Sequence, residues 1–252
     1  HLLLEPDMPG GEDFYSGYLA VIDSNKCIEC GECASVCRFG AVERQGDEFR
    51  VVPLECEGCG YCARICPSEA IEMELQNVGR WYDSPIKSGS RMIHARLGIG
   101  AENSGKLVAR VKKEAKQLAE NQGMDYVIVD GSPGVGCPVV SSLSGADYVL
   151  LVTEPSVAGI HDLKRVYELV KMHRIKTGCI INKYDLNSDK TGEIKKFLAE
   201  EEITLISAIP YSENFTRAMT MGRTIVEYHD KELKAIVEDS WEKVMETVDN
   251  LD

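Results

Sequence analysis

Short apolar runs alternate with amphipathic stretches through most of the chain after residue 104. The apolar runs are residues 126–129, 148–152, 179–181 and 204–209. The stretches with apolar side chains at helical spacing are residues 104–121, 161–172, 190–200 and 231–251. Alternation of buried strands with helices predicts an α/β fold, with a mostly parallel sheet covered by helices on both faces.

The composition is that of a globular protein with an acidic surface. The 252 residues include 28 basic and 41 acidic side chains, which give a formal net charge of −13, and 44% of the residues are hydrophobic. No stretch approaches the roughly 18 apolar residues of a spanning helix, and no secretory signal opens the sequence. The acidic balance argues against a nucleic-acid surface, which needs clustered Lys and Arg. These features predict a cytoplasmic protein that binds neither membrane nor nucleic acid.

Eight of the ten cysteines fall in two groups of equal spacing. Each group follows the pattern C-x2-C-x2-C-x3-C, and the second lies 29 residues after the first. The first group is Cys27, Cys30, Cys33 and Cys37, and the second is Cys56, Cys59, Cys62 and Cys66. The surrounding segments also align, CIECGECASVCRFGAVE with CEGCGYCARICPSEAIE. This region is therefore a duplication of one short metal-binding unit.

The spacing is typical of iron–sulfur clusters. Three thiolates two residues apart lie on a loop that wraps one cluster, and the fourth points toward the other cluster. One [4Fe–4S] cluster is therefore assigned to Cys27, Cys30, Cys33 and Cys66, and the other to Cys56, Cys59, Cys62 and Cys37. Disulfides would need an oxidising compartment. Zinc is the other alternative, although two sets of three plus one cysteines exceed what tetrahedral zinc needs.

From residue 23 to about residue 77, the chain resembles bacterial two-cluster ferredoxins. The resemblance implies an α+β domain with two [4Fe–4S] clusters as cofactors. Arg38 is a departure from the pattern, because many such proteins carry proline after the fourth cysteine, as this chain does at Pro67. The departure concerns the local turn rather than the ligands.

Polar residues follow two of the predicted strands. Asp130 ends the run at residues 126–129 and precedes a glycine-containing loop, and Asn182 opens the sequence Asn-Lys-Tyr-Asp after residues 179–181. An acidic residue at a strand end can hold nucleotide-bound Mg²⁺, although it can equally cap a turn. The loop is of the type that senses a γ-phosphate. The Asn182 amide can meet a purine edge, guanine as much as adenine.

Together these segments resemble the MinD/ParA/Mrp family of deviant P-loop ATPases. The matching pieces are YVIVDGSPGVGCPV, ADYVLLVTEPSVAGIHDLKRV, INKYD and the Ile-Pro at residues 209–210. The whole chain looks like the members of this superfamily that carry an inserted ferredoxin domain. The resemblance implies ATP and Mg²⁺ as ligands, with Asp130 as the Walker B magnesium residue and Asn182 against adenine. It also implies nucleotide binding by Gly134, in the switch loop of residues 132–136, and by Pro210, within a homodimer.

The glycine-rich phosphate loop of that family, with its lysines, is not found in this sequence. Residues 1–6 resemble the segment that follows the family's second strand. We expect roughly 40 residues, the length of a strand, loop, helix and strand, to precede His1 in the natural protein. The sequence as it stands is expected to bind nucleotide poorly, because that loop holds the phosphates. The predicted domains are an ATPase remnant at residues 1–20, an inserted ferredoxin at 21–78 and a nucleotide-binding domain at 79–252.

Two cysteines lie outside the groups. Cys179 begins an apolar run and is predicted to be a buried small hydrophobe. Cys137 lies seven residues after Asp130, where the related nitrogenase iron protein has a cluster ligand, so it is a candidate for an extra ligand. A packed thiol before Pro138 is the favoured interpretation, because a lone cysteine cannot hold a cluster.

The combined features predict an ATP hydrolase, when complete, that couples ATP binding and hydrolysis to electron transfer or iron–sulfur cluster handling. Two alternatives stay open: an electron-carrier module on an inactive ATPase scaffold, and a positioning ATPase of the MinD/ParA type. Residues 1–80 carry 15 acidic and 6 basic side chains, a net charge of −9. This charge predicts a redox or iron–sulfur client protein that docks through a basic surface.

Overall fold

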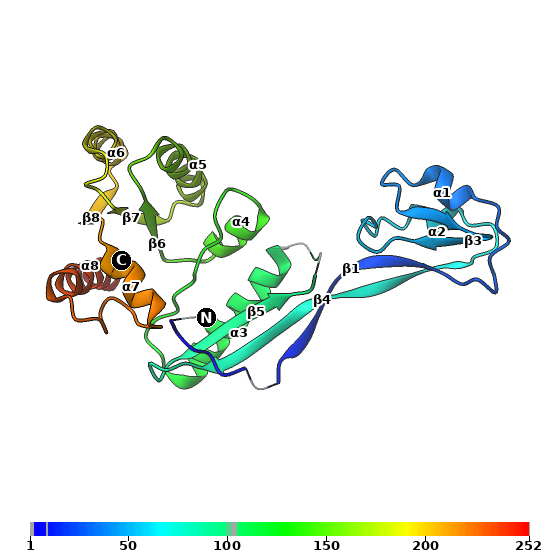
Figure 1. Cartoon of the computed structure of the whole chain (residues 1–252), viewed down its shortest axis with the longest axis horizontal. Helices are drawn as coiled ribbons and strands as arrows, with labels where there is room; N and C mark the ends of the chain where they lie inside the picture. Colours follow the sequence, from blue (N-terminus) through cyan, green and yellow to red (C-terminus); the bar gives the residue numbers. More distant parts are fainter. Residues whose placement is uncertain (1–2, 9, 100, 102–104, 252) are drawn as a thin grey trace. The chain divides into compact units, whose positions relative to one another are not determined.

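The chain divides into two compact units in the computed structural model, which describes residues 3–8, 10–99, 101 and 105–251 (Figure 1). The cysteine-rich unit comprises Met8–Ser84 and Ile93–Asn103. The parallel-sheet unit comprises His1–Asp7, Pro85–Met92 and Ser104–Asp252. The connection between adjacent strands β4 (Ile71–Pro85) and β5 (Arg91–Leu97) therefore belongs to the parallel-sheet unit, although most of both strands belongs to the cysteine-rich unit.

The cysteine-rich unit is built on a sheet in the order β1–β4–β5, in which β1 (Glu12–Ile22) runs antiparallel to β4. Its other elements are α1 (Glu32–Val36), β2 (Val42–Gln45), β3 (Glu48–Val51) and α2 (Tyr61–Ile65). The core gathers Ala20 from β1 and Ile71 from β4 with Cys33 from α1. The cysteine loops therefore pack against the side chains that form the sheet.

The parallel-sheet unit has three parallel strands in the order β6–β7–β8 among the described residues. The strands are β6 (Tyr148–Thr153), β7 (Lys176–Asn182) and β8 (Thr204–Ile209). The helices are α3 (Gly105–Gln122), α4 (Cys137–Leu143), α5 (Val157–His173), α6 (Ser188–Glu200), α7 (Glu213–Thr220) and α8 (Lys231–Asp249). Three predicted strands and all four predicted helices are present, and α4 and α7 were not predicted. None of the helices in the described part of the chain is long and apolar enough to cross a membrane.

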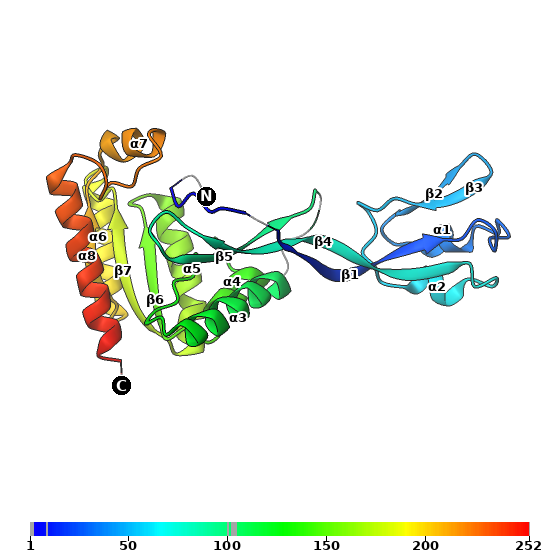
Figure 2. The same ribbon diagram turned by 90° about the horizontal axis from the view of Figure 1, so that it is seen from below.

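Side chains of the parallel strands alternate between two cores, one on each face of the sheet. Cys179 and Ile181 of β7 pack with α5 and α6. Ile180, between them, packs with Val244 of α8 on the opposite face, along which α8 lies in Figure 2. A parallel sheet covered by helices on both faces confirms the predicted α/β fold class.

One predicted strand is not formed. Residues 126–129 are irregular and exposed, with Ile128 76% exposed, and no strand pairs with them within the described ranges. Hydrogen bonds to a neighbouring strand are what stabilise a strand, and β6 ends the sheet as it is described. An apolar run indicates strand propensity but not the neighbour that the strand needs. The prediction that Asp130 ends a buried strand is therefore wrong.

The boundary between the units differs from the predicted one. Residues 12–20, expected in the ATPase remnant, form most of β1 and pair with β4. Residues 79–84, expected in the nucleotide-binding domain, continue β4. Because strands of one sheet are held together by their hydrogen bonds, these residues lie in the cysteine-rich unit instead.

Candidate iron–sulfur and nucleotide sites

The two cysteine groups fold into the same loop-and-helix unit. α1 and α2 each have five residues, and each follows a glycine in the left-handed conformation, Gly31 with φ 76° and Gly60 with φ 72°. Glycine is favoured at both positions because it has no Cβ to clash there. At the other end, Cys37 and Cys66 take the same extended conformation as C-caps. The duplication in the sequence is therefore also a duplication of backbone conformation.

The second loop approaches the sheet closely. Gly58 has φ 64°, and a Cβ at this position would collide with the backbone oxygen of Tyr18 in β1. Only glycine fits both the left-handed conformation and this approach. The contact fixes the second cysteine group against the sheet.

Two cavities in the described part of the cysteine-rich unit are each lined by cysteines from both groups. The Cys66 cavity is lined by Cys27, Cys30, Cys33 and Cys66. The Cys37 cavity is lined by Cys37, Cys56, Cys59 and Cys62. Each cavity thus takes three cysteines from one group and the fourth from the other, the crossed arrangement expected of duplicated cluster-binding units. This lining agrees with the two predicted ligand sets, which stay a prediction, because no three potential ligands among the described residues converge closely enough to form a ready-made metal site.

The thiols of the two sets have different electrostatic surroundings. Burial raises the pKa of Cys33 and of Cys62, because a thiolate loses its hydration there. At Cys66, burial favours the neutral thiol, but hydrogen bonds from the Ala70 N–H and from Ser68 outweigh it and lower the pKa. Metal ligation needs the thiolate form, so a bound metal must offset the burial penalty at Cys33 and Cys62. Four thiols around each cavity form the soft donor set that suits iron–sulfur clusters.

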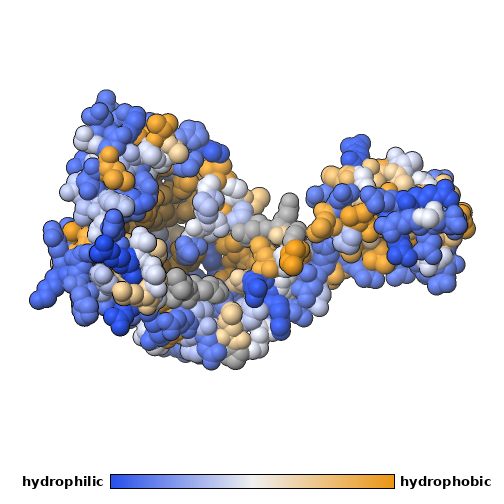
Figure 3. Space-filling view, viewed as in Figure 1, coloured by the Kyte–Doolittle hydropathy of each residue, from blue (hydrophilic) through white to orange (hydrophobic). Residues whose placement is uncertain are grey.

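Each cavity also reaches the surface. Cys30 and Cys59 are exposed, and Ile28, which lines the Cys66 cavity, is 63% exposed. In Figure 3, hydrophobic patches interrupt a largely hydrophilic surface on this unit. Each predicted ligand set therefore has one cysteine at the surface of the unit.

The parallel strands end in connected polar residues. Lys183, after β7, pairs with Glu154, after β6, at an Nζ–Oε1 distance of 2.6 Å. The carboxylate of Asp185 accepts a hydrogen bond of 2.7 Å from the Tyr211 N–H, which ties the loop after β7 to the loop after β8. In parallel sheets, ligands bind at this carboxyl edge.

The predicted nucleotide-binding residues occupy two different places. Asn182 ends β7 and is paired with Ile209, the last residue of β8, and Pro210 follows directly. Asp130 is exposed and follows the irregular residues 126–129, and Gly134, with φ 87°, lies in the loop before α4. The structure therefore places Asn182 and Pro210 on neighbouring strand ends, and it places Asp130 and Gly134 in irregular segments.

The two remaining cysteines differ in exposure. Cys179 is fully buried in β7, and burial raises its pKa to about 12, which confirms the predicted hydrophobic role. Cys137 is the first residue of α4 and is exposed, so the interpretation of a packed thiol is wrong. The helix begins at this position because Gly136 is the N-cap and Pro138 stands in the first turn, where its missing N–H does not disrupt hydrogen bonding. That placement leaves the side chain of Cys137 at the surface.

The sequence pattern did not reveal two lysines that join distant segments. Lys112 of α3 donates to backbone oxygens at the end of α4, and Lys87 pairs with Glu227 at 3.1 Å and donates to Gly222 O. A signal existed for Lys112, because it lies at helical spacing from the apolar Val108 and so on the inward side of α3. No local signal identified Lys87.

Comparison with known proteins places the two units in known classes. Residues 20–73 match the family of 4Fe-4S dicluster domains. An uncharacterized protein of Methanocaldococcus jannaschii is 37% identical over 165 residues, which cover 66% of this chain and 56% of that protein. The septum site-determining protein MinD of Neisseria meningitidis serogroup B is 24% identical over 128 residues, which cover 46% of this chain and 47% of that protein. The chain thus spans about half the length of these two relatives.

The MinD cell division protein of Aquifex aeolicus has a similar structure, with a TM-score of 0.50 and 19% identity, over 66% of this chain and 69% of that chain. This likeness concerns the fold. The protein is therefore an iron–sulfur protein with a 4Fe–4S dicluster domain and an α/β unit. That α/β unit has a MinD-like fold.

Proposed function

We propose that this protein is an iron–sulfur ATPase of the MinD type, in which ATP binding and hydrolysis control electron transfer or the handling of iron–sulfur clusters. The observation that carries the proposal is the pair of four-cysteine cavities in a chain whose other unit has a MinD-like fold. Bound clusters would supply one-electron transfer. Binding and hydrolysis of the nucleotide would supply the free energy and the conformational change that control this transfer.

The eight paired cysteines hold two [4Fe–4S] clusters in crossed sets. Cys27, Cys30, Cys33 and Cys66 hold one cluster, and Cys56, Cys59, Cys62 and Cys37 hold the other. The lining of the two cavities supports this division, and so does the match to a dicluster domain. Each set takes thiols from both cysteine loops. Because the loops around α1 and α2 have the same backbone conformation, the thiols of the two sets are held in the same way.

ATP and Mg²⁺ bind at the carboxyl edge of the parallel sheet. Asn182 contacts the adenine, and Pro210 lies beside it on the next strand end, which the pairing of β7 with β8 supports. Asp130 binds Mg²⁺ once residues 126–129 order beside the sheet, and Gly134 gives the following loop its freedom to respond to the γ-phosphate. That loop leads directly into α4, so nucleotide-dependent movement would reach this helix first.

The active assembly is a homodimer that serves a redox or iron–sulfur client protein. The net charge of −9 over residues 1–80 supports a client with a basic docking surface. Exposed Ile28, in the lining of the Cys66 cavity, and exposed Tyr61, in the lining of the Cys37 cavity, supply apolar contact area within that acidic surface. Attraction between opposite charges would steer the client toward this surface, and the apolar contacts would stabilise the complex once it has formed.

The test is the rate of ATP hydrolysis by the full-length, cluster-loaded protein, measured with the clusters oxidised and again with the clusters reduced. Coupling predicts different rates in the two states. An equal rate in both states would contradict coupling and favour a positioning ATPase. The matched control is the same pair of measurements on protein with Cys33→Ala and Cys62→Ala, in which any difference between redox conditions should disappear.

A second candidate is an electron carrier on an inactive ATPase scaffold. It is favoured by one observation, the exposed position of Asp130 after an irregular segment rather than at a strand end. Reversible cluster reduction without any ATP hydrolysis by the full-length protein would support this candidate. Transfer of iron and sulfide to an apoprotein would instead support a role in cluster handling.

A further inference from the structure

The duplication allows equivalent positions around the two cavities to be compared directly. Residues 29 positions apart correspond, so Cys66 corresponds to Cys37. Differences between the repeats show where the surroundings of two otherwise similar clusters differ. The inference below rests on the proposed function, because it takes each four-cysteine set to hold a cluster.

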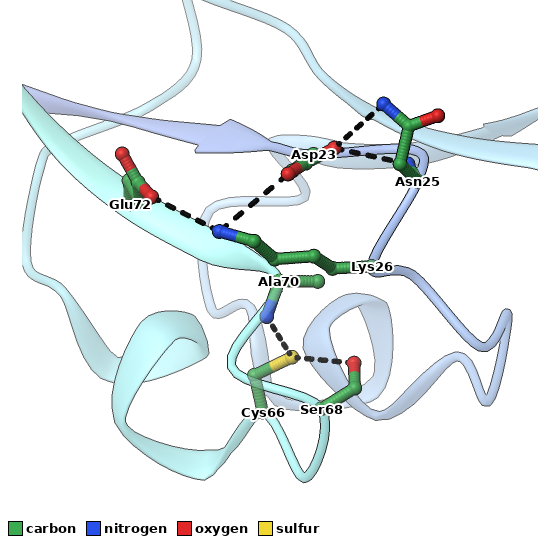
Figure 4. Close-up of polar contacts among 7 residues, drawn as sticks. All are labelled: Asp23, Asn25, Lys26, Cys66, Ser68, Ala70 and Glu72. Atoms are coloured by element: carbon green, nitrogen blue, oxygen red, sulfur yellow. Dashed lines mark hydrogen bonds and ion pairs between the residues drawn. The ribbon is translucent and has the colours of Figure 1, made fainter.

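Cys66 Sγ accepts a hydrogen bond from the Ala70 N–H and is within hydrogen-bonding distance of the Ser68 hydroxyl. The Ala70 backbone nitrogen lies 3.4 Å from Cys66 Sγ, and Ser68 Oγ lies 3.7 Å from the same sulfur. Figure 4 draws both contacts. A metal-bound thiolate has no proton to give, so the Ser68 hydroxyl is the donor in the loaded protein. Ser68 and Ala70 both line the Cys66 cavity, so these donors lie beside the proposed cluster.

Among the described residues, the Cys37 cavity has no equivalent of these donors. Phe39 stands where the other repeat has Ser68, and its ring carries no hydrogen-bonding group. Ala41 corresponds to Ala70, but within the described residues its N–H makes no hydrogen bond to Cys37 Sγ, unlike Ala70 to Cys66. The repeats therefore have the same ligands but different hydrogen bonding to the fourth ligand.

A charge difference acts in the same direction. Lys26, directly before Cys27, corresponds to Glu55, directly before Cys56. The Lys26 ammonium lies 3.4 Å from Glu72 and 3.6 Å from Asp23, and Figure 4 shows it between them. These exposed pairs contribute little, because water and salt screen them. The hydrogen bonds to Cys66 are therefore the main difference.

We propose that the two clusters have unequal reduction potentials, and that Ser68 and the Ala70 N–H give the cluster in the Cys66 cavity the higher one. Addition of one electron increases the negative charge that the ligand sulfurs carry. Donors to a sulfur stabilise this more negative state, so they raise the potential. No proton is released, because the ligands are already thiolates.

Arg38 acts in the opposite direction. It follows Cys37 directly, where Pro67 follows Cys66, and its positive charge would raise the potential of the other cluster. Its side chain is exposed, so solvent screens its effect. The Cys66 donors lie within hydrogen-bond distance of a ligand sulfur in a partly buried site, and their effect is larger.

Unequal potentials give electron transfer a direction. The first electron from a donor would settle on the cluster in the Cys66 cavity, and the cluster in the Cys37 cavity would be reduced second. The second cluster is then the stronger reductant when both are reduced. A client that needs a strong reductant would therefore approach the exposed Cys59 side.

The test is an anaerobic redox titration of the loaded full-length protein with dithionite, followed by electron paramagnetic resonance. Two reduction steps are expected in the wild type. Ser68→Ala should lower the reduction potential of the higher step and leave the reduction potential of the lower step unchanged. Phe39→Ser gives the Cys37 cavity a hydroxyl at the equivalent position. It should therefore raise the reduction potential of the lower step. Ser35→Ala is the matched control, because the Ser35 hydroxyl donates to Glu32 O and not to sulfur.

Iron and sulfide contents separate this inference from the function on which it rests. A content below two complete clusters per chain would overturn the proposed cluster sites and this inference together. Two complete clusters that titrate at one common potential would overturn the inference alone. The inference would also be overturned if Ser68→Ala shifted neither step or shifted only the lower one. If Ser68→Ala does not load with iron, Phe39→Ser decides the question by itself.

Discussion

The ammonium group of Lys112 donates a 2.6 Å hydrogen bond to the backbone oxygen of Ser142, and so joins the middle of α3 to the end of α4. The same group donates to Ser141 O at 3.1 Å and to Ser144 O at 2.8 Å. Carbonyl groups at the end of a helix have no partner within it, and a positive charge there also complements the helix dipole. One lysine therefore completes the end of α4.

Replacement of Lys112 by methionine is expected to destabilise the parallel-sheet unit by about 1–3 kcal/mol, because two partly buried carbonyls and one exposed carbonyl lose a charged donor. Methionine keeps the apolar part of the side chain, so the packing of α3 is retained. The measurement is the urea midpoint followed by the helical circular dichroism signal. The control is Lys113→Met, at an exposed position on the same helix. Equal urea midpoints for both variants would contradict a stabilising role for the three hydrogen bonds that Lys112 donates.

The connection between β4 and β5 is held by Glu227, whose carboxylate accepts hydrogen bonds from the N–H and hydroxyl of Thr224 and from Lys87. The backbone N–H of Thr224, its hydroxyl and Lys87 together lower the pKa of Glu227 from 4.5 to about 2. A lowered pKa means that the carboxylate contributes its full stabilisation above about pH 4.5, and that this contribution is lost as the pH falls through about 2.

At neutral pH, Glu227→Gln removes this contribution. The amides of Ile86 and Lys87, which donate to Ser90 O and Leu4 O, are expected to exchange faster with deuterium in the variant. Mass spectrometry of peptides covering residues 85–92 measures the change. Glu242→Gln, an exposed position on α8, should leave these rates unaltered. Unaltered rates in Glu227→Gln as well would show that the carboxylate does not hold the connection.

Cys137 and Cys179 should react very differently with iodoacetamide. Cys137 is exposed at the start of α4, whereas Cys179 is fully buried and its pKa is about 12, so its thiolate is scarce at neutral pH. In the loaded protein, Cys137 is expected to be modified and Cys179 is not. Peptide mass spectrometry before and after iron removal would also show whether the eight paired cysteines become reactive only when iron is absent. Protection of Cys137 that depends on iron would indicate that it is a ligand after all.

Asp130→Asn is expected to lower ATP hydrolysis by the full-length protein at least about 100-fold, because Mg²⁺ contributes several kcal/mol to phosphoryl transfer. Asn182→Ala removes an expected hydrogen bond to the base and should weaken nucleotide binding roughly tenfold. Asp125→Asn, an exposed neighbour of the same irregular segment, is the control for Asp130. If Asp130→Asn and Asp125→Asn hydrolyse ATP at the same rate, Asp130 is not the magnesium residue.

Local spacing predicted the cysteine site better than it predicted the sheet. The crossed cysteine sets depend on short loops, in which Gly31 and Gly60 set the backbone, so the pattern of the sequence carries most of the geometry. Residues 126–129 have the same apolar character as β6, but a strand also requires a neighbour, which an apolar run does not specify. Ser212 is a helix N-cap before α7, a signal that was available in the sequence. The hydrogen bond from Lys112 to Ser142 O joins residues 30 positions apart and depends on tertiary packing alone.

The crossed cluster assignment can be tested by combining cysteine substitutions. Cys33 and Cys66 belong to one proposed set although they come from different groups, whereas Cys33 and Cys37 share a group but belong to different sets. Cys33→Ala and Cys66→Ala should each remove the same cluster, so the double variant should keep as much iron as either single variant. Cys33→Ala with Cys37→Ala should remove both clusters, because each substitution then affects a different site. Iron content and the number of reduction steps measure both cases. The opposite result, in which the Cys33 and Cys37 pair keeps one cluster and the Cys33 and Cys66 pair keeps none, would mean that each group of four binds its own cluster.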